Sequence, residues 1–101
     1  MSETERLWKQ MDSILQKKKE CFVCHTTRDL ECHHCLPGTW RRKLSEEYGL
    51  KVWLCHEHHT GRTGVHADPK FMLELKQYAQ TVFVGKYGSE LWMQRFGKNY
   101  L

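Results

Sequence analysis

The feature of this chain that most constrains its fold is the clustering of its metal-binding side chains. All seven histidines and all five cysteines of the 101 residues lie between residues 21 and 66. Thiolates and imidazoles are the side chains that bind zinc and related transition metals. A chain of this length has a thin hydrophobic core, so a metal that joins distant segments would contribute much of its stability. We therefore expect a single domain, residues 1–101, organised around bound metal.

The cysteine count favours metal ligation over disulfides. Five is an odd number, and the first residues, MSETERLWKQ, lack the apolar segment of a secretory signal. The sequence contains no run of 18 apolar residues, so we expect no membrane span and no membrane partner. These features predict reduced cysteines in a cytoplasmic setting. The net charge of +4 permits a polyanionic partner such as DNA but does not identify one.

Two tetrahedral zinc sites are compatible with the spacing of the ligands. The first would use four thiolates in close succession: Cys21, Cys24, Cys32 and Cys35. The second would use two knuckles that lie 30 residues apart in the chain: Cys21 and Cys24, then Cys55 and His58. We favour the second, because the first leaves the ligands of the later knuckle without a role. Both sets are soft donors suited to structural zinc.

The stretch LECHHC, residues 30–35, predicts a short strand with two adjacent histidines. Neighbouring residues of a strand point to opposite faces, so His33 and His34 do not easily bind the same metal. One of them can bind a metal while the other faces a water molecule, and Glu31 shares the face of His33. A metal ligand beside a general base is what phosphodiester hydrolysis requires.

The flanking segments predict helices. Apolar residues at helical spacing indicate an amphipathic N-terminal helix within residues 1–20. Within the middle part, a helix that Gly49 ends is followed by a strand over residues 50–54. Residues 67–101 predict two C-terminal helices, one that begins at Asp68-Pro69 and one that Ser89 caps.

Taken together, the pattern C-x2-C … E-x-H-H … L-C-x2-H-H resembles the zinc-stapled branch of the HNH, or ββα-metal (His-Me finger), endonuclease superfamily. More narrowly, RRKLSEEYGLKVWLCHEHH followed by GVH is similar to small HNH-type proteins of bacteriophages and prophages. The resemblance covers residues 21–66. It implies an α+β fold with a ββα-metal core and a pair of zinc knuckles, flanked by N-terminal and C-terminal helices. It also implies a metal-dependent endonuclease that hydrolyses DNA in the cytoplasm of a bacterial host.

The resemblance implies a role for each motif residue. His34 would be the general base, and Glu31 would orient that base or the attacking water. A catalytic divalent metal (Mg²⁺, Mn²⁺, Ni²⁺ or Zn²⁺) would be held by His33 and His59, with His66 as a third ligand. A structural zinc would be held by Cys21, Cys24, Cys55 and His58. Five basic residues flank the site, and two interpretations of each are open: a contact with DNA phosphates, or a solvated or salt-bridged surface role. These residues are Arg41, Arg42, Lys43, Lys51 and Arg62.

One position departs from the family pattern. The family carries a central asparagine that braces the loop over the histidine pair, whereas the only asparagine here is Asn99, outside the motif. This departure favours an alternative interpretation, in which the chain is a non-catalytic zinc-binding module of phage origin. Such a module would bind DNA or inhibit or modulate a host protein.

Overall fold

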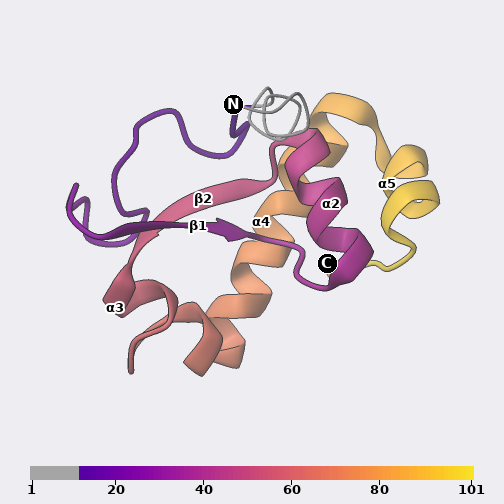
Figure 1. Ribbon diagram of the computed structural model, residues 1–101. Coiled ribbons are helices and arrows are strands. Elements are labelled where there is room, and N and C mark those ends of the chain that lie inside the picture. Colours follow the sequence, from indigo (N-terminus) through magenta and orange to yellow (C-terminus); the bar gives the residue numbers. More distant parts are fainter. Residues whose placement is uncertain (1–11) are drawn as a thin grey trace.

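A two-stranded antiparallel sheet and four α-helices make up the part of the chain that the structure describes, residues 12–101 of a computed structural model. The fold is therefore α+β, as predicted. The elements are, in chain order, β1 (Leu30–His34), α2 (Thr39–Tyr48), β2 (Lys51–Cys55), α3 (His56–His59), the 3₁₀ helix η1 (Val65–Ala67), α4 (Pro69–Tyr87) and α5 (Ser89–Phe96). Figure 1 shows α3 at one end of the strand pair and α2 at the other, with α4 running from the α3 side toward α5.

The register of β1 against β2 decides which side chains share a face of the sheet. His33 lies opposite Val52, and His34 lies opposite Lys51. Because side chains alternate along a strand, His33 and His34 lie on opposite faces, as the sequence predicts. One face carries Glu31, His33, Val52 and Leu54, and the other carries Cys32, His34, Lys51 and Trp53.

The helix boundaries follow local capping chemistry. Gly49 ends α2 with a φ of 71°, a left-handed conformation that glycine adopts without strain. The Asp68 side chain accepts hydrogen bonds from the backbone N–H groups of Lys70 and Phe71, and Pro69 is the first residue of α4. The prediction for α5 is off by one residue: Gly88 is its N-cap, and Ser89 is its first helical residue.

The predicted N-terminal helix is wrong for residues 12–20, which run as irregular bends, and its first part falls outside the described residues. Ser13 Oγ accepts hydrogen bonds from the backbone N–H groups of Leu15 and Gln16, which competes with helix formation. The segment is bonded instead to β2: Ser13 Oγ donates to the Lys51 carbonyl, and the Gln16 side chain accepts from the Trp53 N–H at 2.8 Å. Tertiary hydrogen bonds thus replace helical ones here.

The core joins the sheet to the C-terminal helices. Val52 and Leu54 of β2 are almost completely buried, and they belong to the same apolar cluster as Leu75 of α4. In the described residues, no helix is both long enough and apolar enough to cross a membrane.

An aromatic cluster fixes α5 against α4. Trp92 stacks on Phe96 with ring centroids 4.2 Å apart, and Phe83 meets both rings edge-on. All three side chains are fully buried, and the Trp92 indole N–H donates to the Lys98 carbonyl at 2.8 Å. Edge-to-face and offset stacked pairs stabilise beyond the area that they bury. This cluster holds the chain end on the body of the domain.

Replacing Phe83 with alanine should therefore lower the free energy of unfolding by about 3–5 kcal/mol, because a large cavity opens at the centre of the aromatic cluster. Met93 is 47% exposed on the same helix pair, and Met93→Ala should cost less than about 0.5 kcal/mol. Urea unfolding followed by circular dichroism would measure both. Equal losses for the two variants would show that the cluster is not the main support of α5.

Candidate metal centre

Three cysteines and one histidine converge at the end of β2. Cys21, Cys24, Cys55 and His58 offer ligand atoms that all lie within 4.8 Å of one another. Cys24 Sγ is 3.8 Å from Cys55 Sγ, and His58 Nδ1 is 3.2 Å from Cys55 Sγ and 3.6 Å from Cys21 Sγ. Tetrahedral zinc with ordinary bond lengths places two sulfur ligands about 3.8 Å apart and a sulfur and a nitrogen about 3.6 Å apart. The four side chains therefore fit a metal such as zinc.

Local backbone structure prepares this site for a cation. Burial opposes ionisation of Cys21, but backbone N–H groups, led by that of Cys24, and the His58 side chain lower the pKa of its thiol to about 6. Thiolate is the form that binds a metal. The Cys21 carbonyl accepts the His25 N–H at 2.9 Å, and His25 has a φ of 65°, so the chain turns tightly behind the two cysteines. The turn presents both sulfur atoms on one side.

The alternative site with four thiolates is not formed. Cys35 is completely buried in the hydrophobic core, and Cys32 lies on the face of the sheet that carries Trp53. Burial raises the pKa of both thiols, so both stay protonated at neutral pH. The two cysteines thus act as small apolar side chains, as the preferred interpretation of the sequence expects.

A second cluster lies beside the first and contains only histidines. His33 of β1, His59 of α3 and His66 of η1 offer ring nitrogens within 4.8 Å of one another. The Nε2 atoms of His59 and His66 are 3.1 Å apart, near the distance of about 3.3 Å between two imidazole ligands of one zinc ion. The chain thus directs adjacent residues to different clusters: His58 belongs to the first and His59 to the second.

His33 supplies the observation that tests whether a metal fits this second cluster. The side chain is 2% exposed, and its Nε2 atom has no hydrogen-bond partner among the described residues. Burial and the positive charge of protonated His59 or His66 lower the pKa of His33 to about 3, so the ring is neutral at neutral pH. A buried polar atom without a partner is costly, and a metal ion would satisfy it. The donor set and the orphaned atom therefore both fit a divalent transition metal.

Glu31 orients a ligand of this cluster. Its carboxylate accepts a hydrogen bond from His59 Nδ1 at 2.6 Å and a second from His56 Nδ1 at 3.1 Å. A histidine that donates from Nδ1 presents the lone pair of Nε2, which in His59 points toward His66. The same hydrogen bonds lower the pKa of Glu31. Glu31 therefore contacts one member of the histidine cluster, His59, and holds it in the tautomer whose Nε2 atom can bind a metal.

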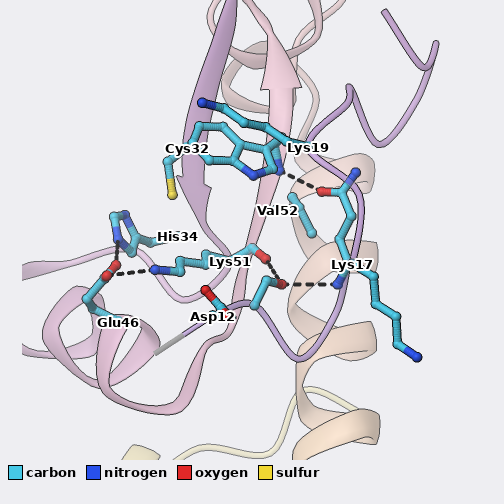
Figure 2. Close-up of a pocket in the computed structure, with 11 residues that line it drawn as sticks. Asp12, Lys17, Lys19, Cys32, His34, Glu46, Lys51 and Val52 are labelled. Carbon is cyan, nitrogen blue, oxygen red and sulfur yellow. Dashed lines mark hydrogen bonds and ion pairs between the residues drawn. The ribbon is translucent and has the colours of Figure 1, made fainter. Parts of the chain in front are cut away.

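His34 occupies the opposite face of the sheet. Its Nε2 atom lies 2.8 Å from Glu46 Oε2, and the other oxygen of Glu46 accepts from Lys51 Nζ at 2.7 Å. Figure 2 shows these three side chains together at the edge of a pocket, with Cys32 above them. Burial lowers the pKa of His34 although the Glu46 carboxylate opposes that shift. The imidazole is thus neutral at neutral pH and has a fixed hydrogen-bond partner.

The five predicted DNA-contacting residues fall into two groups. Arg42, Lys43 and Arg62 are exposed. Arg41 is held by the body of the domain, since its Nη2 donates to the Phe96 carbonyl, and Lys51 is paired with Glu46. The first three side chains are therefore free to reach phosphates, whereas the other two already make intramolecular contacts.

Two glycines let the loop after α3 return His66 to the cluster. A Cβ atom at Gly64 would lie 2.6 Å from the His59 carbonyl oxygen, and one at Gly61 would lie 2.6 Å from the Cα atom of Glu57. Both contacts are with backbone and too short for any side chain. In the sequence, His66 follows the HH pair by more than one helical turn. The tight loop nevertheless brings the side chain of His66 next to that of His59.

Sequence reasoning missed two features of the site. Glu46 is the hydrogen-bond partner of His34. It lies on α2, twelve residues later in the chain, and no local sequence pattern predicts this pairing. The residues of the irregular segment 12–20 that border the pocket beside His34 were also missed, because the sequence predicts a helix there. In both cases the contact depends on how α2 and the N-terminal segment fold back onto the sheet.

Comparisons with protein-family models, with curated proteins and with solved structures give no match to this chain. The function is therefore inferred from the chemistry of the two clusters.

The Cys21–Cys24–Cys55–His58 cluster should retain one tightly bound zinc per chain. Structural zinc typically contributes about 10–16 kcal/mol, as much as the whole stability of a small domain, so Cys55→Ser should release zinc and unfold the protein. Cys32→Ser is the matched control and should keep the metal, because Cys32 is not one of the four residues whose ligand atoms converge. Zinc content by mass spectrometry under native conditions and far-ultraviolet circular dichroism would measure both effects. Zinc loss from Cys32→Ser with retention in Cys55→Ser would contradict the assignment.

Gly64→Ala should disrupt the histidine cluster selectively. The added methyl group must displace the backbone at His59, which moves His66 away from its neighbours, while the cysteine cluster stays in place. We expect at least a tenfold weaker binding of a second equivalent of Ni²⁺ or Zn²⁺, with the first zinc unchanged. Isothermal titration calorimetry of zinc-loaded protein would show this, with Gly85→Ala as the control because nothing lies within 4 Å of a Cβ atom there. Equal second-site affinities in both variants would contradict it.

Proposed function

We propose that this protein is a metal-dependent endonuclease of the HNH type that hydrolyses phosphodiester bonds of DNA. The observation that carries the proposal is the three-histidine cluster, in which the buried Nε2 of His33 lacks a partner among the described residues. Three protein ligands leave further coordination positions open, which is the pattern of a catalytic metal site, whereas the neighbouring site with four ligands is closed and structural. An open metal site supported by a structural one is an arrangement suited to catalysis.

The elements around the cluster support the same proposal. His33 comes from β1, β2 pairs with that strand, and His59 comes from the helix that follows β2 directly. Two antiparallel strands and a helix around a metal are the parts of a ββα-metal core, so we assign that core to β1, β2 and α3. His66 is exposed, which leaves the cluster open to a large substrate on that side.

A divalent metal bound by the three histidines would supply positive charge to the scissile phosphate and to the leaving 3′ oxygen. Imidazole ligands suit Zn²⁺, Ni²⁺ and similar ions better than Mg²⁺, which prefers oxygen. Glu31 contributes by holding His59 in the ligating tautomer.

His34 is the proposed general base. The neutral imidazole that its lowered pKa maintains can accept a proton from the attacking water, and the Glu46 carboxylate stabilises the imidazolium that forms. His34 is the last residue of β1, so a phosphate that lies across the end of this strand borders both the His33 face and the His34 face. The exposed Arg42, Lys43 and Arg62 would hold neighbouring phosphates.

Removing each histidine separates the two roles. His34→Ala should lower the rate of plasmid cleavage by about 10²–10⁴, because a base acts only on the transferred proton, and added metal should not restore it. His33→Ala should also lower the rate, but through weaker metal binding, so high concentrations of Ni²⁺ or Mn²⁺ should recover part of it. The measurement is single-turnover relaxation of supercoiled plasmid against metal concentration.

His25→Asn is the control, because the exposed His25 ring contacts Glu20 and belongs to neither cluster, and asparagine tolerates the φ of 65° at this position. It should cleave as the wild-type protein does. Normal cleavage by His34→Ala would refute the assignment of the base. A wild-type protein that cuts no DNA with any divalent metal would instead support the non-catalytic zinc module.

A further inference from the structure

A pocket of about 790 Å³ lies on the face of the sheet opposite the three-histidine cluster. Side chains of β1 and β2 form its floor, and the irregular segment after residue 11 forms one wall. The residues that line the pocket include Lys17, Lys19, Cys32, His34, Glu46 and Trp53. The volume is in the range of pockets that bind small organic molecules or parts of larger ones.

The floor of the pocket includes an aromatic ring with a lysine side chain lying over it. Trp53 is half-buried, and Lys19 Nζ lies 4.7 Å from the centre of its ring. Lys19 is exposed, so its ammonium group can leave the ring at little cost. A nucleobase stacked on an aromatic ring gains more than an exposed lysine does in the same place. The displaced ammonium group then remains beside the ring, where it can meet a phosphate.

The charges around the pocket favour an anionic ligand. Both carboxylate oxygens of Glu46 have partners, one in Lys51 Nζ and one in His34 Nε2, so neighbouring side chains balance its negative charge. Lys19 is exposed, and Figure 2 shows its side chain lying across the floor of the pocket, whereas the Lys17 side chain extends away from it. Asp12 is the remaining acidic side chain of the lining. An aromatic ring with a lysine ammonium group beside it is a combination that binds single-stranded nucleic acid.

We propose that this pocket binds an unpaired nucleotide of the DNA substrate, with its base on Trp53 and its phosphate held by Lys19. The inference rests on the proposed endonuclease function and adds a preference for DNA that contains single-stranded nucleotides. A base inside a duplex shows its faces only to its neighbours in the stack, so a recessed ring can stack only on a base that is out of the helix. Because His34 borders the pocket, the bound strand also lies next to the proposed general base.

Binding of oligonucleotides tests the proposal without requiring catalysis. The probe is a fluorescein-labelled single strand of about twelve nucleotides, compared with the blunt duplex of the same sequence. Full-length, zinc-loaded protein is titrated with no other divalent metal, and fluorescence anisotropy gives both affinities. We expect the wild-type protein to bind the single strand at least tenfold more tightly than the duplex.

Substitutions of Trp53 distinguish stacking of a base on the ring from burial against any apolar side chain. Trp53→Leu should weaken binding of the single strand about five- to a hundredfold and should leave binding of the duplex nearly unchanged. Trp53→Phe retains a stacking surface and should recover most of the affinity. Equal binding of the single strand and the duplex by the wild-type protein, or a Trp53→Leu variant that binds as the wild type does, would overturn the proposal.

Lys19 provides a second test that does not depend on the folding of the Trp53 variants. Lys19→Gln should weaken binding of the single strand about fivefold and lower the dependence of the affinity on salt concentration. The matched control is Lys18→Gln, since Lys18 is exposed and does not line the pocket. Equal losses in the two variants would show a general charge effect and would overturn the proposal.

The outcome for the pocket is distinguishable from the outcome for the endonuclease. Preference for the single strand that depends on Trp53, together with no cleavage under any metal, would support the pocket and refute the endonuclease. Cleavage of plasmid by a protein that binds single strands and duplexes equally would support the endonuclease and refute the pocket.

Discussion

The convergence of Cys21 and Cys24 with Cys55 and His58 is the contact on which the rest of the site depends. It joins the turn before β1 to the junction of β2 and α3, so the start of β1 and the end of β2 are held together at one end of the strand pair, where the second cluster begins. A two-stranded sheet alone is marginally stable in water. A metal held at this junction would set the start of α3, and the start of α3 sets the position of His59. The two clusters are thus linked through adjacent residues, His58 and His59.

Strand alternation gives the sheet two faces with different chemistry. The face of His33 holds three imidazoles around a point that fits a metal, and the face of His34 holds Glu46, Lys51 and Trp53 beside a pocket. The two faces meet at the end of β1, where His33 and His34 are neighbours in the chain. In the proposed function, a strand of DNA that crosses this end contacts the metal site on one side and the pocket on the other.

Two carboxylates organise the histidines without belonging to either metal set. Glu31 accepts the Nδ1 hydrogen of His59, and Glu46 lies at hydrogen-bond distance from His34 Nε2. Burial keeps His33 and His34 uncharged by lowering the pKa of each ring. A neutral imidazole is the form that can bind a metal or accept a proton, so the partial burial of this region serves both proposed roles.

The sequence by itself determined the opposite orientation of His33 and His34, the end of α2 at Gly49 and the start of α4 at Asp68-Pro69, because these depend on local periodicity and capping. It left two sets of zinc ligands open, and the structure decided between them by bringing Cys55 and His58 to Cys21 and Cys24. Only the tertiary structure decided the rest. Glu46 reaches His34 because α2 folds back onto the sheet, and residues 12–20 leave the predicted helix because β2 offers their polar groups better-placed partners. Local patterns encode conformation within a few residues, whereas these contacts depend on which distant backbone and side-chain groups packing brings together.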